Sequence, residues 1–114
     1  FKAALQASDG IVISFAEHNG AYTTAFKNIF DWISRLEKPI WCGKPMFLLS
    51  TSTGVRGGKT VLELAHLRLS RDMPNIPCFA LPSYKETFDE EKGIIEATHL
   101  AAFNEALEVF VRQL

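Results

Sequence analysis

The chain has 114 residues, of which 47% are hydrophobic and 22% are charged, and its 12 basic and 13 acidic side chains leave a net charge of −1. This apolar content excludes a disordered chain and predicts one compact domain. A near-neutral charge offers no basic surface to a phosphate backbone, so we expect no nucleic-acid partner. No apolar run approaches the roughly 20 residues that cross a bilayer, so we also expect no membrane-spanning segment.

Short apolar runs alternate with longer segments of helical period from the start of the chain. Residues 11–15, Ile-Val-Ile-Ser-Phe, follow an Asp-Gly turn signal and predict the first strand. Apolar side chains then recur with helical spacing over residues 22–36, which predicts an amphipathic helix with Thr23 or Thr24 as its N-cap. Residues 46–50 form a second continuous apolar run and predict the next strand.

The next helical segment, residues 59–71, carries apolar side chains on two faces. Val61 and Ala65 share one face with other apolar residues, while Leu64 and Leu67 lie well away from it. A helix that covers a sheet needs only one apolar face for that purpose. The second face therefore indicates a further packing partner.

The last part of the chain predicts a third strand and a long final helix. Residues 76–81 form the strand, and Pro77 favours a position at the edge of the sheet because proline cannot donate a hydrogen bond to a neighbouring strand. The final helix begins between Glu90 and Glu96. Apolar strands joined by helical connections are typical of a parallel sheet covered on both faces, so the predicted fold class is α/β.

Ligands of such sheets bind beyond the carboxyl ends of the strands, which makes two loops the candidate site. The loop over residues 51–58 is similar to a phosphate-binding P-loop, but three residues separate Gly54 from Gly58 where that motif needs four, which disfavours a nucleoside triphosphatase. Its glycines would still let a flat or anionic ligand approach the backbone. The alternative is a plain tight connection between strand and helix.

The other loop, residues 16–22, gathers a carboxylate, an imidazole and a carboxamide directly after a strand. Glu17, His18 and Asn19 supply these groups, which can hydrogen-bond the edge of a polar heterocycle, although Asn19-Gly20 is also a common turn. No serine or cysteine has an identifiable base partner, and the three histidines are too scattered for a metal motif. We therefore expect neither nucleophilic nor metal catalysis.

Two cysteines, Cys42 and Cys78, lie far apart and outside any CxxC pair. This usage favours a reducing compartment over a disulfide scaffold, so we expect a cytoplasmic location. The simplest role for both thiols is that of buried small hydrophobic side chains.

Five segments of the chain form a recognisable combination in their order and spacing. They are Ser8-Asp9-Gly10-Ile11-Val12-Ile13, Glu17-His18-Asn19-Gly20, Phe26-Lys27-Asn28-Ile29-Phe30-Asp31-Trp32, Gly43-Lys44-Pro45 and Ser52-Thr53-Gly54-Val55-Arg56-Gly57-Gly58. Together they resemble the NAD(P)H-dependent FMN reductase family of flavodoxin-like proteins, which includes quinone, chromate and azo-dye reductases. That family usually has Pro at position 16 and Tyr at position 18, where this chain has Ala and His. An aromatic beside the flavin is thereby replaced by a smaller, titratable side chain.

The resemblance implies a flavodoxin-like doubly wound sheet of strand order 2-1-3-4-5, in which the three predicted strands are strands 3 to 5. The first strand, the phosphate loop and the second strand would be absent, so we expect residues 1–114 to form a single partial domain that needs an upstream amino-terminal segment. The resemblance also implies a homodimer or homotetramer. The candidate interface residues, with ordinary core packing as the alternative, are Phe30, Trp32, Leu64 and Leu67.

The same resemblance implies the function. FMN would lie with its ring against both loops, take hydride from NAD(P)H and reduce a small acceptor such as a quinone, a metal oxyanion or an azo compound. No catalytic side chain is required for this chemistry. The alternative is a non-enzymatic binding or regulatory module with a degenerate flavin site. The candidate cofactor-binding residues are Ala16, Glu17, His18, Asn19, Gly20, Ser52, Thr53, Gly54, Arg56 and Gly57.

Overall fold

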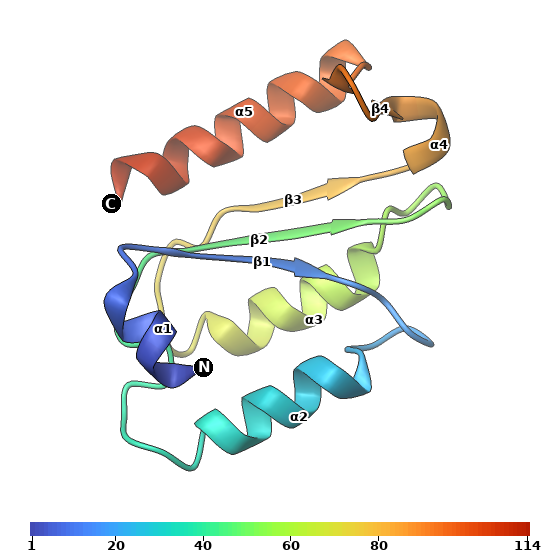
Figure 1. Cartoon of the computed structure of the whole chain (residues 1–114). Coiled ribbons are helices and arrows are strands. Elements are labelled where there is room, and N and C mark those ends of the chain that lie inside the picture. Colours follow the sequence, from blue (N-terminus) through green and yellow to red (C-terminus); the bar gives the residue numbers. More distant parts are fainter.

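The computed structural model describes residues 1–114 and shows a three-stranded sheet between two layers of helices (Figure 1). The strands are β1 (Ile11–Phe15), β2 (Met46–Thr51) and β3 (Cys78–Leu81), in the order β1-β2-β3. Both neighbouring pairs are parallel, with Ile11 opposite Met46 and Leu48 opposite Cys78. The predicted α/β class with a parallel sheet is confirmed.

The two faces of the sheet are covered by different helices (Figure 1). Helices α2 (Thr24–Ile33) and α3 (Lys59–Leu69) lie on one face, and α5 (Ala97–Arg112) lies on the other. Helix α2 has one of its predicted caps, because the Thr23 hydroxyl oxygen accepts the N–H of Phe26 at 3.1 Å. None of the helices is long and apolar enough to cross a membrane.

Helix α5 begins at the late end of its predicted range. Its N-cap is Glu96, whose carboxylate accepts the backbone N–H groups of His99 and Thr98. These two hydrogen bonds hold the pKa of Glu96 below its ordinary value. A carboxylate at the N-cap thus satisfies the first backbone donors of the helix.

Two apolar clusters form the core, one on each face of the sheet. The larger has 14 buried residues on the side of α2 and α3, and the smaller has four on the side of α5. Successive residues of β2 reach opposite clusters, as the pleat of a strand requires: Leu48 belongs to the larger and Phe47 to the smaller. A sheet covered on both faces explains why the strands are apolar throughout.

Four short elements were not predicted from the sequence. The first helix, α1, is held by Lys2, whose Nζ donates to the carbonyl oxygens of Pro39 at 2.8 Å and Ile40 at 2.6 Å. The acidic segment at residues 89–92 forms the turn of an antiparallel hairpin, in which the Asp89 carboxylate accepts two backbone N–H groups. The four elements are α1 (Lys2–Ala7), α4 (Tyr84–Thr87), β4 (Phe88–Asp89) and β5 (Gly93–Ile94).

The sheet has one edge at β3 and the other at β1. The predicted edge position of this strand is confirmed, because β3 pairs with β2 alone. The strand begins at Cys78, so Pro77 precedes it and does not lie within it as predicted. Strand β1 is not buried on both faces, because α5 lies over β2 and β3 and leaves the Val12 side chain 54% exposed. The two edge strands, β1 and β3, are therefore less buried than the central strand β2.

The four candidate interface residues divide between core and surface. Phe30 is buried and stacks on Trp41 with ring centroids 5.7 Å apart, so it follows the core-packing alternative. Trp32, Leu64 and Leu67 are exposed.

The two cysteines are half-buried thiols that are not bonded to each other. Burial raises the pKa of the Cys78 thiol to about 11. Neither thiol is as deeply enclosed as the sequence suggested, because Cys42 follows the buried Trp41 in a loop and Cys78 lies on an edge strand.

Candidate functional site

The two predicted loops leave neighbouring strands at the same end of the sheet (Figure 1). Residues 16–22 follow β1, and residues 52–58 follow β2 and lead into α3. Phe15 and Ser50 face each other in the register of the two parallel strands, so the loops begin side by side. The exit of β3 lies at this end as well.

The first loop is built around a tight turn at its tip. The N–H of His18 donates to the carbonyl of Ala21 at 3.1 Å, and the N–H of Ala21 donates back at 3.2 Å. Asn19 and Gly20 between them have φ values of 53° and 75°, the left-handed pair that a type I′ turn requires. The turn alone therefore accounts for the Asn-Gly pair, and both residues are exposed at its tip.

Glu17 connects this loop to helix α3. One carboxylate oxygen, Oε1, accepts the backbone N–H of Val61 at 2.7 Å, and Val61 is the third residue of α3. The N-cap of α3 is Gly58, which has no side chain to satisfy the first N–H groups of the helix. Glu17 supplies the missing cap from another loop, at the end of the helix where negative charge is favoured.

The second loop is packed closely against the sheet. Ser50 Oγ donates to the carbonyl of Gly57 at 2.8 Å, and Gly57 has a φ of 61°. A Cβ at Gly57 would lie 2.6 Å from the carbonyl oxygen of Leu81, so this glycine is required by packing. Arg56 lies along α3, with its guanidinium 3.4 Å from the Thr60 hydroxyl.

The segment after β3 supports the second loop from the other side. The N–H of Ser83 donates to the carbonyl of Gly54 at 2.8 Å, and the N–H of Tyr84 donates to the carbonyl of Ser52 at 2.9 Å. Neither residue was among the candidate site residues predicted from the sequence. They could have been predicted from their position, because they follow the third strand at the carboxyl edge where the other two loops lie.

A set of backbone donors remains free at the second loop. The N–H groups of Thr53, Val55 and Arg56 donate to no acceptor within the chain, and all three residues are exposed. A loop that carries free donors next to a helix N-terminus suits the oxygen and nitrogen atoms at the edge of a flat heterocycle. No group of three or more His, Cys, Asp or Glu side chains is placed to hold a metal ion.

The two largest cavities lie along α3 and away from the tips of both loops. They measure about 410 and 530 Å³, and Leu67 lines both. A smaller cavity of about 160 Å³ lies beside the second loop, where Ser14, Thr51 and Tyr84 contribute to its wall. The predicted cofactor-binding residues thus form a surface of exposed loops and not a closed pocket.

Comparison with known proteins identifies relatives along most of the chain. An NADPH-dependent FMN reductase family model matches residues 1–93. The chain is 28% identical over 100 residues to an NADPH:quinone oxidoreductase of Arabidopsis thaliana, covering 84% of this chain and 50% of that protein. It is 27% identical over 122 residues to an NAD(P)H-dependent FMN reductase of Pseudomonas aeruginosa, covering 100% of this chain and 65% of the relative. The chain thus spans about half to two thirds of the length of these curated relatives.

Known structures agree with this result. The flavoenzyme NAD(P)H:(acceptor) oxidoreductase FerB of Paracoccus denitrificans superposes with a TM-score of 0.79 at 23% identity, over 98% of this chain and 64% of that one. An oxidoreductase of Corynebacterium diphtheriae gives a TM-score of 0.60 at 25% identity, over 98% of this chain and 60% of that one. The fold is therefore flavodoxin-like, as the sequence resemblance implied. With the family model matched over residues 1–93, the chain belongs to the NADPH-dependent FMN reductase family.

Proposed function

We propose that this chain carries part of the site of an NAD(P)H-dependent flavin oxidoreductase, with residues 16–20 and 52–57 against the ring of FMN. The observation that carries the proposal is the pair of loops at the carboxyl ends of adjacent parallel strands, one of which has free N–H groups. Membership of the family supports FMN as the ligand.

The donor set of the second loop fits a flavin. FMN, when bound, would supply the hydride chemistry that this chain's side chains do not provide. The N–H groups of Thr53, Val55 and Arg56 would donate to the oxygen and nitrogen atoms along the edge of the ring. Fixed donors of this kind favour negative charge at that edge without any rearrangement of the protein.

The other residues of the site would hold the loops in place. Glu17 fixes the first loop to α3 through its 2.7 Å hydrogen bond to the Val61 N–H. The N–H groups of Ser83 and Tyr84 fix the second loop through the carbonyls of Gly54 and Ser52. Glu17 is therefore a positioning residue in this proposal. His18 is exposed beside the Asn19-Gly20 turn, and its imidazole would meet the ligand.

The acceptor in this proposal is a small molecule that meets the ring on its open side. Quinones and azo compounds are supported by relatives named as an NADPH:quinone oxidoreductase and, in a Bacillus species, as an NADPH azoreductase that is 33% identical over 69 residues. Metal oxyanions belong to the same proposal. We further propose a cytoplasmic homo-oligomer, for which the exposed Leu64 and Leu67 support an interface.

The test is a titration of the purified protein with FMN, followed by NADH or NADPH oxidation with a quinone as acceptor. We expect flavin fluorescence to be quenched on binding, and we expect His18→Tyr to change the affinity because residue 18 lies beside the ligand. The matched control is His99→Tyr, on helix α5, which should bind FMN like the native chain.

Two other results would change this conclusion. FMN binding without oxidation of either nucleotide would favour a non-enzymatic binding module. An unchanged spectrum and fluorescence of FMN at high protein concentration would contradict the proposed site.

A further inference from the structure

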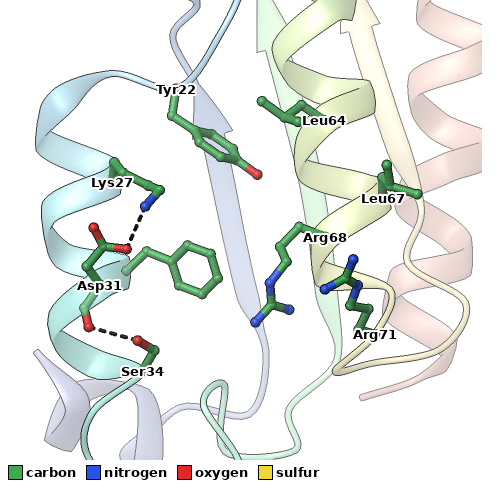
Figure 2. Close-up of a pocket in the computed structure, with 9 residues that line it drawn as sticks. Tyr22, Lys27, Asp31, Ser34, Leu64, Leu67, Arg68 and Arg71 are labelled. Atoms are coloured by element: carbon green, nitrogen blue, oxygen red, sulfur yellow. Dashed lines mark hydrogen bonds and ion pairs between the residues drawn. The ribbon is translucent and has the colours of Figure 1, made fainter.

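A cleft separates the outer parts of α2 and α3 (Figure 2). Its volume is about 410 Å³, and small-molecule sites in proteins commonly measure about 300–1,000 Å³. Side chains of both helices form its walls, together with Tyr22 from the first loop and Arg71 from the turn after α3. None of the residues at 16–20 or 52–57 lines it, so the cleft is separate from the surface proposed for FMN.

The Tyr22 hydroxyl is a buried polar group that no atom of the chain satisfies. The Tyr22 ring is held against Phe15 and Phe26, with centroids 6.0 and 5.0 Å away, and its hydroxyl points across the cleft toward α3 (Figure 2). Burial raises the pKa of this phenol, so the hydroxyl keeps its proton at neutral pH and can donate it. A ligand with an oxygen acceptor at this end of the cleft would satisfy the hydroxyl.

The opposite end of the cleft has a positive charge without a counter-charge. Lys27 pairs with Asp31 at 2.7 Å, and Arg68 pairs with Asp72 at 3.0 Å. Arg71 is exposed and forms no ion pair within the chain. The charges of the cleft therefore complement a ligand with a single negative charge.

Arg68 adds hydrogen-bond donors beside this unpaired cation (Figure 2). Its guanidinium carbon lies 5.1 Å from the centroid of the Phe30 ring. The hydrogen bond to Asp72 comes from Nη1 and uses one of the five N–H groups of the guanidinium. The remaining donors, with those of Arg71, match the two coplanar oxygen atoms of a carboxylate.

The other walls of the cleft are apolar. Phe30 is buried at its α2 side, and Leu64 and Leu67 line its α3 side. These side chains favour a flat apolar body between the two polar ends of a ligand. Both leucines are exposed, so an interface at these residues would close the cleft over a bound ligand.

We propose that the cleft between α2 and α3 binds a small aromatic carboxylate that has an oxygen atom at the far end of its ring. The carboxylate would accept hydrogen bonds from Arg68 and Arg71, and the distal oxygen would accept one from Tyr22. The ring would lie along Phe30. This site does not depend on the flavin chemistry proposed above.

Calorimetric titration with 4-hydroxybenzoate tests the proposal. The native protein should bind it at least tenfold more tightly than 4-hydroxybenzamide, which has the same shape without the charge. It should bind it about fivefold more tightly than benzoate, which lacks the distal oxygen. Arg71→Gln should remove the preference for the charged ligand, and Tyr22→Phe should remove the preference for the distal oxygen.

The controls separate this site from general effects and from the flavin site. Arg112→Gln, an exposed change of the same kind on α5, should bind 4-hydroxybenzoate like the native chain. Both cleft variants should keep the native circular dichroism, since Arg71 is exposed and Tyr22→Phe retains the packed ring. FMN should leave the affinity for 4-hydroxybenzoate unchanged.

Four results would overturn the proposal. They are no binding of 4-hydroxybenzoate, equal binding of the amide, preferences that both cleft variants retain, and displacement of 4-hydroxybenzoate by FMN. Because the readout is binding at the cleft, none of these results would show that FMN fails to bind at the two loops.

Discussion

Replacement of Glu17 is the most direct test of how the two loops are held together. Its Oε1 atom accepts the Val61 N–H at 2.7 Å, in the first turn of a helix whose N-cap is a glycine. A hydrogen bond to a charged group contributes about 1.5–3 kcal/mol, and the exposure of Glu17 places this one at the lower end. We therefore expect Glu17→Ala to reduce the free energy of unfolding by about 1.5 kcal/mol.

Glu17→Gln separates the hydrogen bond from the charge. The amide oxygen can still accept the Val61 N–H but loses the interaction of a negative charge with the helix N-terminus, which contributes about 0.3–1 kcal/mol. The loss should therefore be about half that of the alanine variant. A change of 1 kcal/mol lowers the melting temperature of a domain near this size by about 4–8 °C, so calorimetry can resolve both variants.

The control for this series is Glu105→Ala, which removes an exposed glutamate of α5 that has no ion pair. It should change the stability by less than about 0.5 kcal/mol. If Glu17→Ala were no less stable than this control, the contact with α3 would contribute nothing, and the link between the loops would be refuted. Faster hydrogen exchange of the Val61 amide in Glu17→Ala would locate the effect in the first turn of α3.

Two further predictions concern backbone strain and thiol reactivity. Gly57→Ala should lower the free energy of unfolding in urea by more than about 2 kcal/mol, because a Cβ would lie 2.6 Å from a backbone carbonyl oxygen. Gly20→Ala should lower it by about 1 kcal/mol, because a Cβ there meets nothing within 4 Å. Equal losses in the two variants would contradict the packing argument. In a Cys42→Ser variant, Cys78 should react with a disulfide reagent about 100-fold more slowly than the unfolded chain at the same pH. Burial raises the pKa of this thiol from 9.0 to about 11, which lowers the fraction of the reactive thiolate. Similar rates in the folded and unfolded chains would show that the thiol is solvated.

The regular part of the fold could be predicted because its elements are long enough to show a period. The strand at residues 11–15 and the Thr23 cap of α2 agree with the structure. Helix α3 ends at Leu69, two residues before the predicted end, where the chain turns toward β3. Pro77 predicted the edge position of β3 correctly, because proline has no backbone N–H to donate to a neighbouring strand.

The short elements could not be predicted, because contacts distant in sequence create them. Helix α1 has six residues, too few to be stable alone, and depends on the bonds of Lys2 to carbonyls of residues 39 and 40. The strands of the β4-β5 hairpin have two residues each, too few to show the alternation of apolar and polar side chains that indicates a strand.

The site could be placed at two loops from the strand ends, but its internal contacts could not. Glu17 was expected beside a heterocycle because of its chemistry. Its observed partner is the Val61 N–H, 44 residues away, and only the parallel pairing of β1 and β2 brings the two together. Ser83 was missed for a similar reason, since its contact with Gly54 depends on the neighbouring position of β3.

The support that the β3 exit gives to the second loop has a consequence for ligand affinity. Two hydrogen bonds from residues 83 and 84 and the close contact of Gly57 with Leu81 already restrict the loop in the free protein. The conformational entropy of ordering the loop is then lost during folding and not during association, so less of the ligand's interaction energy is consumed on binding. Changes at residues 81–84 should consequently alter how fast a ligand leaves the loop, although none of their side chains has to touch it.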